Sequence, residues 1–170
     1  MADQPPRLDV SSLVFTRLPS KTLPTSDRLL AAVKQAEKRT FPPNEAFDFD
    51  AEMKKRTTNV YGVHCRSAGS DGRIELCGYA VYVRSKLATR IHKVCVLEGY
   101  RRQGVGRWMM ERLLEELVKA SAASVDLWVD TSRIPARQLY ACCGFHEMDT
   151  VRGYYSPTRD AVRMELRLDG

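Results

Sequence analysis

Short stretches of this chain alternate apolar and polar residues or are rich in β-branched residues, which predicts strands, whereas others place apolar residues every three or four positions, which predicts helices. Strands are predicted at Leu13–Arg17, Asn59–Cys65, Ile74–Val83, Thr89–Leu97, Val125–Val129, Phe145–Gly153 and Val162–Leu168. Helices are predicted from Thr25 or Ser26 to the residue before Phe41, within Asn44–Arg56, at Gln103–Ala120 and from Pro135 to Gly144. The third helix is expected to bury Met109, Met110, Leu113, Leu114, Leu117 and Val118.

Proline and glycine separate these elements. Proline has no amide hydrogen and disfavours helical geometry in the residue before it, so the first helix should end before Pro42. Pro135 suits the first turn of the last helix, and Gly144 suits its left-handed end. Turn-forming residues at 67–72 predict an antiparallel hairpin. The predicted order is strand, two helices, three strands, helix, strand, helix and two strands.

A chain of 170 residues is long enough for one domain that buries roughly 70% of its unfolded surface. Residues 1–11 are polar and contain prolines, so we expect a disordered lead there. The rest, residues 12–170, is expected to form a single domain, because no repeat or linker divides it.

Composition excludes several functional classes. We find no apolar run of membrane-spanning length and no basic-then-apolar leader, so we expect no membrane partner and a cytoplasmic or nuclear protein. The five cysteines have no disulfide or zinc spacing, and the three histidines lack ligand spacing, so no metal is expected. The net charge of +6 suits an anionic cofactor, and no basic stripe interleaved with aromatics indicates a nucleic-acid partner. The sequence does not indicate the oligomeric state.

The segment from Tyr100 to Arg107 has the features of a phosphate-binding loop. It follows an apolar strand and opens an amphipathic helix, whose first N–H groups are unpaired and carry partial positive charge. Its two glycines let the backbone approach a ligand closely. The residues expected to bind the phosphates are Arg101, Arg102, Gln103, Gly104, Val105, Gly106 and Arg107. A dinucleotide-binding loop would need three glycines in another spacing, and a P-loop would need Gly-Lys-Ser/Thr.

The run from Arg101 to Gly106 resembles the acetyl-CoA signature of the GNAT superfamily of N-acyltransferases: Gln or Arg, two residues, Gly, one residue, then Gly or Ala. The predicted order of elements is also that of the GNAT fold. The resemblance implies an α/β (α+β) fold, in which a mixed central sheet of about seven strands is flanked by about four helices. It also implies acetyl-CoA as the cofactor.

In the GNAT family the strand before this loop splays from its neighbour, and its freed backbone binds the pantetheine arm of acetyl-CoA. Alignment on Arg101 assigns these contacts to Val94, Cys95 and Val96. The same valines could simply be core residues, because backbone contacts leave the side chains free to pack. The sequence does not separate the two possibilities.

A second family landmark, Leu-Tyr followed three residues later by Gly-Phe, is matched by Leu139-Tyr140 and Gly144-Phe145. The resemblance implies that Tyr140 is the general acid that protonates the leaving thiolate, although a lone tyrosine there would more often be a core residue. Arg133 stands where the family usually has an asparagine that contacts the cofactor.

The general base is less clear, because the two positions where the family often has a basic group hold Arg90 and Trp128. His92 lies on the same strand face as Arg90 and is the best remaining candidate. A histidine at the matching position occurs in arylalkylamine acetyltransferases. A hydrogen-bonded structural histidine is an equally good explanation.

Two loops resemble those that flank the incoming peptide in protein N-terminal acetyltransferases. They contain Phe41-Pro42 and Tyr154-Tyr155, the latter predicted in a loop before the last strand. The resemblance implies that the substrate is the N-terminal α-amine of a protein or peptide. A small-molecule amine, such as an arylalkylamine or polyamine, is the main alternative, and protein lysine comes third. A fourth possibility is an acyl-CoA-binding module without turnover.

Overall fold

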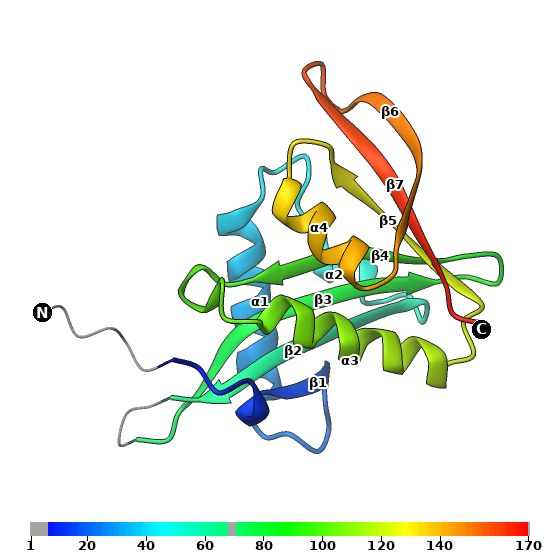
Figure 1. Cartoon of the computed structure of the whole chain (residues 1–170). Coiled ribbons are helices and arrows are strands. Elements are labelled where there is room, and N and C mark those ends of the chain that lie inside the picture. Colours follow the sequence, from blue (N-terminus) through cyan, green and yellow to red (C-terminus); the bar gives the residue numbers. More distant parts are fainter. Residues whose placement is uncertain (1–6, 68–70, 170) are drawn as a thin grey trace, which may run out of the picture.

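The structure is a computed structural model that describes residues 7–67 and 71–169. It contains one seven-stranded sheet in the order β1-β2-β3-β4-β5-β7-β6 (Figure 1). Strands β4 and β5 run parallel, and the other neighbours run antiparallel. The strands are β1 (Val14–Leu18), β2 (Thr58–Arg66), β3 (Ile74–Arg84), β4 (Thr89–Val96), β5 (Ser124–Asp130), β6 (His146–Ser156) and β7 (Arg159–Arg167). The predicted mixed sheet and element order are confirmed.

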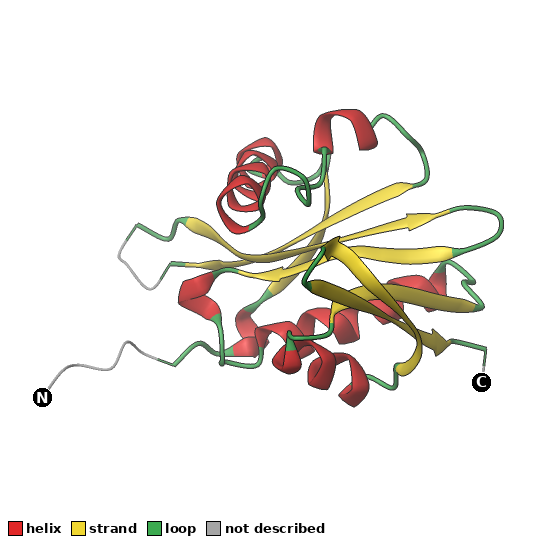
Figure 2. Cartoon of the chain, turned by 90° about the horizontal axis from the view of Figure 1, so that it is seen from above, coloured by secondary structure: helices red, strands yellow, loops and turns green. Residues whose placement is uncertain are grey.

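The α-helices cover both faces of the sheet, α1 and α2 on one and α3 and α4 on the other (Figure 2). Each face therefore has its own apolar core. The helices are α1 (Ser26–Thr40), α2 (Phe49–Glu52), α3 (Val105–Lys119) and α4 (Ile134–Cys142), with short 3-10 helices η1 (Val10–Ser12) and η2 (Glu98–Tyr100).

Helix α3 buries most of the face that its sequence predicts. Met109, Met110 and Leu113 are fully buried, but Val118 is 56% exposed, so the prediction for Val118 was wrong. Val118 is four residues after the partly buried Leu114, but it lies in the last turn of α3, beside the exposed Lys119. The three-and-four spacing alone therefore does not decide burial at the end of the helix.

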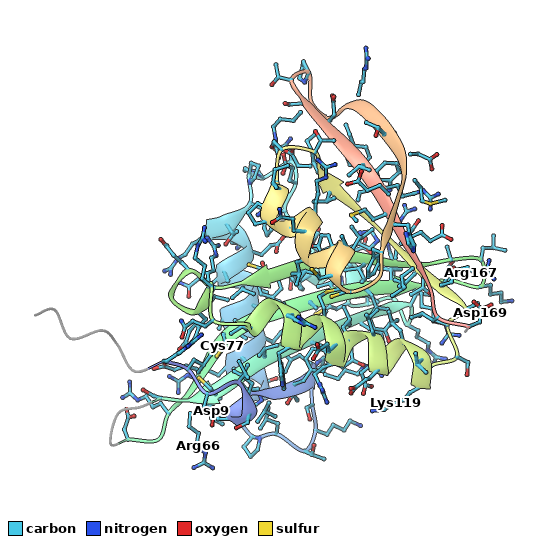
Figure 3. All side chains as sticks on the ribbon, in the orientation of Figure 1. Asp9, Arg66, Cys77, Lys119, Arg167 and Asp169 are labelled. Carbon is cyan, nitrogen blue, oxygen red and sulfur yellow. The ribbon has the colours of Figure 1, made fainter. Side chains whose placement is uncertain are left out.

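The N-terminal segment differs from the predicted disordered lead. Residues 1–6 of that lead lie outside the described residues. The side chains of Leu8 and Val10 pack against the core on the α3 face, and the Leu8 N–H donates to Gln103 Oε1 at 3.1 Å. Asp9, labelled in Figure 3, accepts a hydrogen bond from the Ser11 N–H and caps η1. Residues 8–11 therefore contact the rest of the chain through two apolar side chains and a cap, and the division into a lead and a domain stays a prediction.

Strands β4 and β5 pair over a short distance and then separate. Their register covers Arg90 with Asp126 and Ile91 with Leu127. After Ile91, strand β4 stays bonded to β3 while β5, β7 and β6 turn away (Figure 1). The β5-facing backbone groups of residues 92–96 are left without a strand partner, and such groups need other partners when a ligand or side chains bury them. The splay implied by the family resemblance is present.

The last hairpin is longer than predicted. Strand β6 reaches Ser156 and β7 begins at Arg159, so Tyr154 and Tyr155 lie in a strand and not in a loop. The register of β6 with β7 is irregular between Val151 and Ser156, so the two tyrosines do not follow the simple alternation of a regular strand. None of the helices among the described residues is long and apolar enough to cross a membrane.

Candidate functional site

The splay of β4 and β5 opens a cavity of about 570 Å³. Its walls come from β4, β5, α4, the end of β6, the start of β7 and the segment between α1 and α2. Of the predicted site residues, those that line it are Phe41, His92, Val94, Arg133, Tyr140, Tyr154 and Tyr155. The structure thus brings the predicted acid, the predicted base and most of the predicted substrate residues into one space.

The other predicted site residues do not line this cavity. Pro42 is exposed, and Cys95 is buried in the core on the α1 face, since it alternates with Val94 and Val96. The two valines pack against the opposite core, so their side chains do have the structural role that the sequence left open. The residues predicted to bind phosphate, 101–107, lie at the start of α3, outside the cavity lining.

The loop before α3 has the shape that the glycines predict. Gly104 caps the helix with φ +84, a left-handed conformation that strains other residues. A Cβ on Gly106 would come within 3.3 Å of Leu139 Cδ2, so this backbone packs tightly against α4. Arg101 Nε donates to Val96 O at 2.9 Å, which ties the loop to the end of β4. The 15-residue helix α3 begins with unpaired N–H groups beside Arg102 and Arg107, which suits a pyrophosphate.

Tyr140 is buried on the cavity wall, 8% exposed, with its ring 6.1 Å from that of Phe145. Burial raises the pKa of Tyr140 to about 12, while the positive charge of Arg133 acts in the opposite direction. The phenol therefore keeps its proton at neutral pH and can donate it into the cavity. The core-residue and general-acid explanations are compatible, because the ring packs while the side chain still lines the cavity.

His92 lines the cavity beside Phe47, with ring centroids 5.9 Å apart. The pKa of His92 is lowered, first by partial desolvation of its imidazolium among the cavity atoms and second by the positive charge of Arg90. Neither ring nitrogen has a hydrogen-bond partner among residues 7–67 and 71–169. A neutral imidazole with free nitrogens can accept a proton.

Lys93, which sequence analysis did not select, lies on the same wall. Its ammonium is 3.0 Å from Glu37 Oε1, 2.8 Å from Glu45 O and 3.6 Å from the centre of the Phe41 ring. Lys93 thus holds β4 against the segment after α1. This explains why Phe41 reaches the cavity.

Glu37 is the buried centre of this arrangement, at 1% exposure. Besides the Lys93 ion pair, its carboxylate accepts hydrogen bonds from the Tyr79 hydroxyl and, at 2.8 Å, from the Phe47 N–H. The signal in the sequence for this buried group was a carboxylate next to Ala36, on the apolar face of α1, because a charge buried on such a face needs a partner. The partners themselves come from distant parts of the chain.

Arg159 also lines the cavity and was also missed in the sequence. Its Nε donates to Asp130 Oδ2 at 2.8 Å and its Nη1 to Glu45 Oε1 at 2.5 Å. The guanidinium carbon lies 5.0 Å from the centre of the Tyr155 ring. One arginine therefore joins β7, the end of β5 and the segment after α1.

Three aromatic side chains of the cavity lining, from β5 and β6, contact one another. The rings of Trp128 and Tyr154 stack at 5.0 Å with an interplanar angle of 15°, and Tyr155 meets Tyr154 edge-on at 4.9 Å. Arg90 lies 5.9 Å from the Trp128 ring centre and pairs with Asp126 at 2.8 Å. Tyr155 has its pKa raised to about 12 by burial, so its hydroxyl stays protonated. Trp128, rejected as a base in the sequence, is part of the binding wall.

Comparison with known proteins agrees with this geometry. The [ribosomal protein bS18]-alanine N-acetyltransferase of Escherichia coli (strain K12) is 38% identical over 79 residues, which are 45% of this chain and 53% of that protein. The chain thus spans about half the length of the curated relatives it matches.

Two solved structures share the fold at lower identity. Arabidopsis thaliana NAA60 in complex with acetyl-CoA has a TM-score of 0.74 at 16% identity, over 93% of this chain and 99% of that one. Spermidine/spermine N-acetyltransferase SpeG from Vibrio cholerae has a TM-score of 0.70 at 14% identity, over 93% and 94%. The profile of the Acetyltransferase (GNAT) family matches residues 30–145. With the splayed strands and the glycine loop, this match shows that the chain belongs to the GNAT family of acetyltransferases.

Proposed function

We propose that this protein is an acetyl-CoA-dependent N-acetyltransferase that acts on the N-terminal α-amine of a protein or peptide. The observation that carries the proposal is the single cavity at the β4–β5 splay, where Tyr140, His92 and the pair Tyr154-Tyr155 meet. The relatives named as a [ribosomal protein bS18]-alanine N-acetyltransferase and an N-alpha-acetyltransferase support the same substrate class.

The chain offers a matching site for acetyl-CoA. The β5-facing backbone of residues 92–96 would hold the pantetheine arm, and the start of α3 with Arg101, Arg102 and Arg107 would hold the pyrophosphate. When bound, acetyl-CoA supplies an acetyl group activated as a thioester. Bound in this way, the acetyl group would lie toward the splay of β4 and β5, where the cavity opens.

In a direct transfer, one side chain accepts a proton from the amine and another donates a proton to the leaving sulfur. The nitrogen–carbon bond forms as the carbon–sulfur bond breaks, and the sulfur leaves with the electron pair. His92 takes the proton that the amine loses, and Tyr140 Oη gives a proton to the sulfur. Deprotonating an α-amine of pKa near 8 at pH 7 costs about 1 kcal/mol, against more than about 4 kcal/mol for lysine. A weakly basic histidine therefore suits an α-amine better than a lysine side chain.

The charges of the cavity favour a peptide over a polyamine. Glu45 and Asp130, the carboxylates of the wall, are both bonded to Arg159. No carboxylate among the described lining residues is left to receive a second ammonium group. Because the unpaired Arg133 would repel a polycation, we expect poor use of polyamines. The likeness to SpeG keeps a small amine as the second candidate.

We expect His92→Ala to lower kcat/KM about 10- to 100-fold and to change the acid side of the pH–rate profile. The pKa of His92 is lowered, so the wild-type imidazole stays neutral across neutral pH. The rate limited by this base should fall only below the ordinary histidine value of about 6.5. Acetyl transfer measured against pH tests this, with His146→Ala, an exposed histidine outside the cavity, as the control. An unchanged profile in His92→Ala would exclude His92 as the base.

The substrate class is tested by acetyl-CoA consumption with free-N-terminus peptides, Nα-blocked lysine peptides, arylalkylamines and polyamines. We expect turnover with the free N-termini. Tyr154→Ala should raise the peptide KM several-fold without changing the acetyl-CoA KM, because Tyr154 belongs to the acceptor wall. Met148→Ala, exposed on the same strand but outside the cavity, should change neither. Preference for a small amine would overturn the peptide assignment.

A further inference from the structure

Arg133 differs from the other cations that line the cavity. Arg90 pairs with Asp126 at 2.8 Å, Lys93 pairs with Glu37 at 3.0 Å, and Arg159 pairs with two carboxylates. The guanidinium of Arg133 has no hydrogen-bond or ion-pair partner within the described part of the chain. It is a full positive charge on the cavity wall that no carboxylate neutralises.

Arg133 lies on the same helix face as Tyr140, the proposed general acid. Arg133 caps α4, with its N–H donating to Asp130 O at 3.0 Å and its carbonyl accepting from the Arg137 N–H at 3.1 Å. Residues three and seven positions apart share one face of a helix, and accordingly Arg133, Ala136 and Tyr140 all line the cavity.

We propose that Arg133 stabilises the negative charge that develops on the departing thiolate next to Tyr140. The inference rests on the proposed use of acetyl-CoA. Breaking the carbon–sulfur bond leaves an electron pair on sulfur before the proton of Tyr140 Oη reaches it. Beside a buried phenol this charge is poorly solvated, and an unpaired cation on the same cavity wall, although Arg133 is itself exposed, lowers its cost. The opposing effect of Arg133 on the pKa of Tyr140 agrees with this placement.

The proposal is tested by binding of coenzyme A and of desulfo-coenzyme A, which lacks the thiol. Calorimetry across the pH range around an ordinary thiol pKa of about 8.5 gives the ratio of the two dissociation constants. In the wild type this ratio should favour coenzyme A increasingly as pH rises, because the bound thiolate is stabilised. The groups near Tyr140 that also titrate, Tyr155, Cys143 and Cys95, together with His92, are present in both the wild type and the Arg133 variants, so the comparison between these proteins isolates the effect of Arg133.

Arg133→Met should reduce that preference about tenfold or more at the alkaline end, and Arg133→Lys should retain most of it. Arg137→Met is the charge-matched control on the same helix, since Arg137 pairs with Glu147 and does not line the cavity. It should behave as the wild type. In parallel, kcat should fall about tenfold or more in Arg133→Met, with little change in the KM for the amine.

Three results would overturn the proposal. One is an unchanged ratio in Arg133→Met. Another is equal weakening of both ligands by that substitution, which would make Arg133 a simple contact to the cofactor. The last is a wild type that binds neither ligand, which would overturn the proposed use of acetyl-CoA as well.

Discussion

Tyr140→Phe is expected to lower kcat about 100-fold or more while the protein stays folded. General acid catalysis contributes roughly 10²- to 10⁴-fold, and phenylalanine removes only the hydroxyl that donates the proton. The ring itself, packed near Phe145, is kept, so the core loses no apolar contact. Steady-state acetyl-CoA consumption with a free-N-terminus peptide measures the loss, and thermal unfolding checks the fold.

Tyr61→Phe is the matched control. Tyr61 is also a buried tyrosine, stacked on Phe15 at 4.6 Å, but it lies in β2 and does not line the cavity. Tyr61→Phe should leave kcat unchanged. If Tyr140→Phe kept wild-type turnover, another group would be the acid. If wild type and variant both bound acetyl-CoA without turnover, the chain would be a binding module rather than an enzyme.

Glu37→Leu is expected to be the most destabilising single change among the site residues, at about 3–5 kcal/mol. The substitution leaves Lys93 without its ion-pair partner, at 12% side-chain exposure, and removes the acceptor of the Tyr79 hydroxyl and the Phe47 N–H. Leaving buried polar groups unpaired lowers the free energy of unfolding by more than the Glu37 carboxylate itself contributes to it. Urea unfolding followed by fluorescence measures the difference in free energy.

The double variant Glu37→Leu/Lys93→Met should recover part of this loss, because it removes the unpaired charge together with its partner. Lys34 is also on α1 and forms a pair of the same kind with Asp50 at 2.6 Å, but this pair is exposed. Lys34→Met breaks it. It should leave the urea midpoint nearly unchanged. Equal effects of Glu37→Leu and Lys34→Met would show that the buried network does not stabilise the fold.

Loss of the Glu37 network should also affect the cavity. The Phe47 N–H and Lys93 both bond Glu37, and Lys93 holds Phe41 through its ring. A variant that still folds should therefore show a raised KM for the amine. The KM for acetyl-CoA should change less, because the start of α3 packs on the other face of the sheet (Figure 2).

The sequence by itself determined the features that depend on neighbouring residues. The period of α3, the turn at Gly104 and the left-handed end of α4 at Gly144 follow from backbone preference and helical spacing. The glycine signature and the Tyr140 segment also indicated the family from the sequence, because the residues of each motif are close together in the chain. Even here the prediction from local spacing was wrong at one position, because Val118 is exposed and not buried.

Only the tertiary structure decided which charges meet. Glu45 and Arg159 are 114 positions apart and Glu37 and Tyr79 are 42 apart, yet each pair is bonded. Such pairs depend on strand register and on the angle at which β4 and β5 separate, and neither is encoded by local spacing. The same geometry left Arg133 unpaired, which no count of charges along the chain would have shown. A charge acts over a few ångströms of space, whereas the sequence orders residues only along the chain.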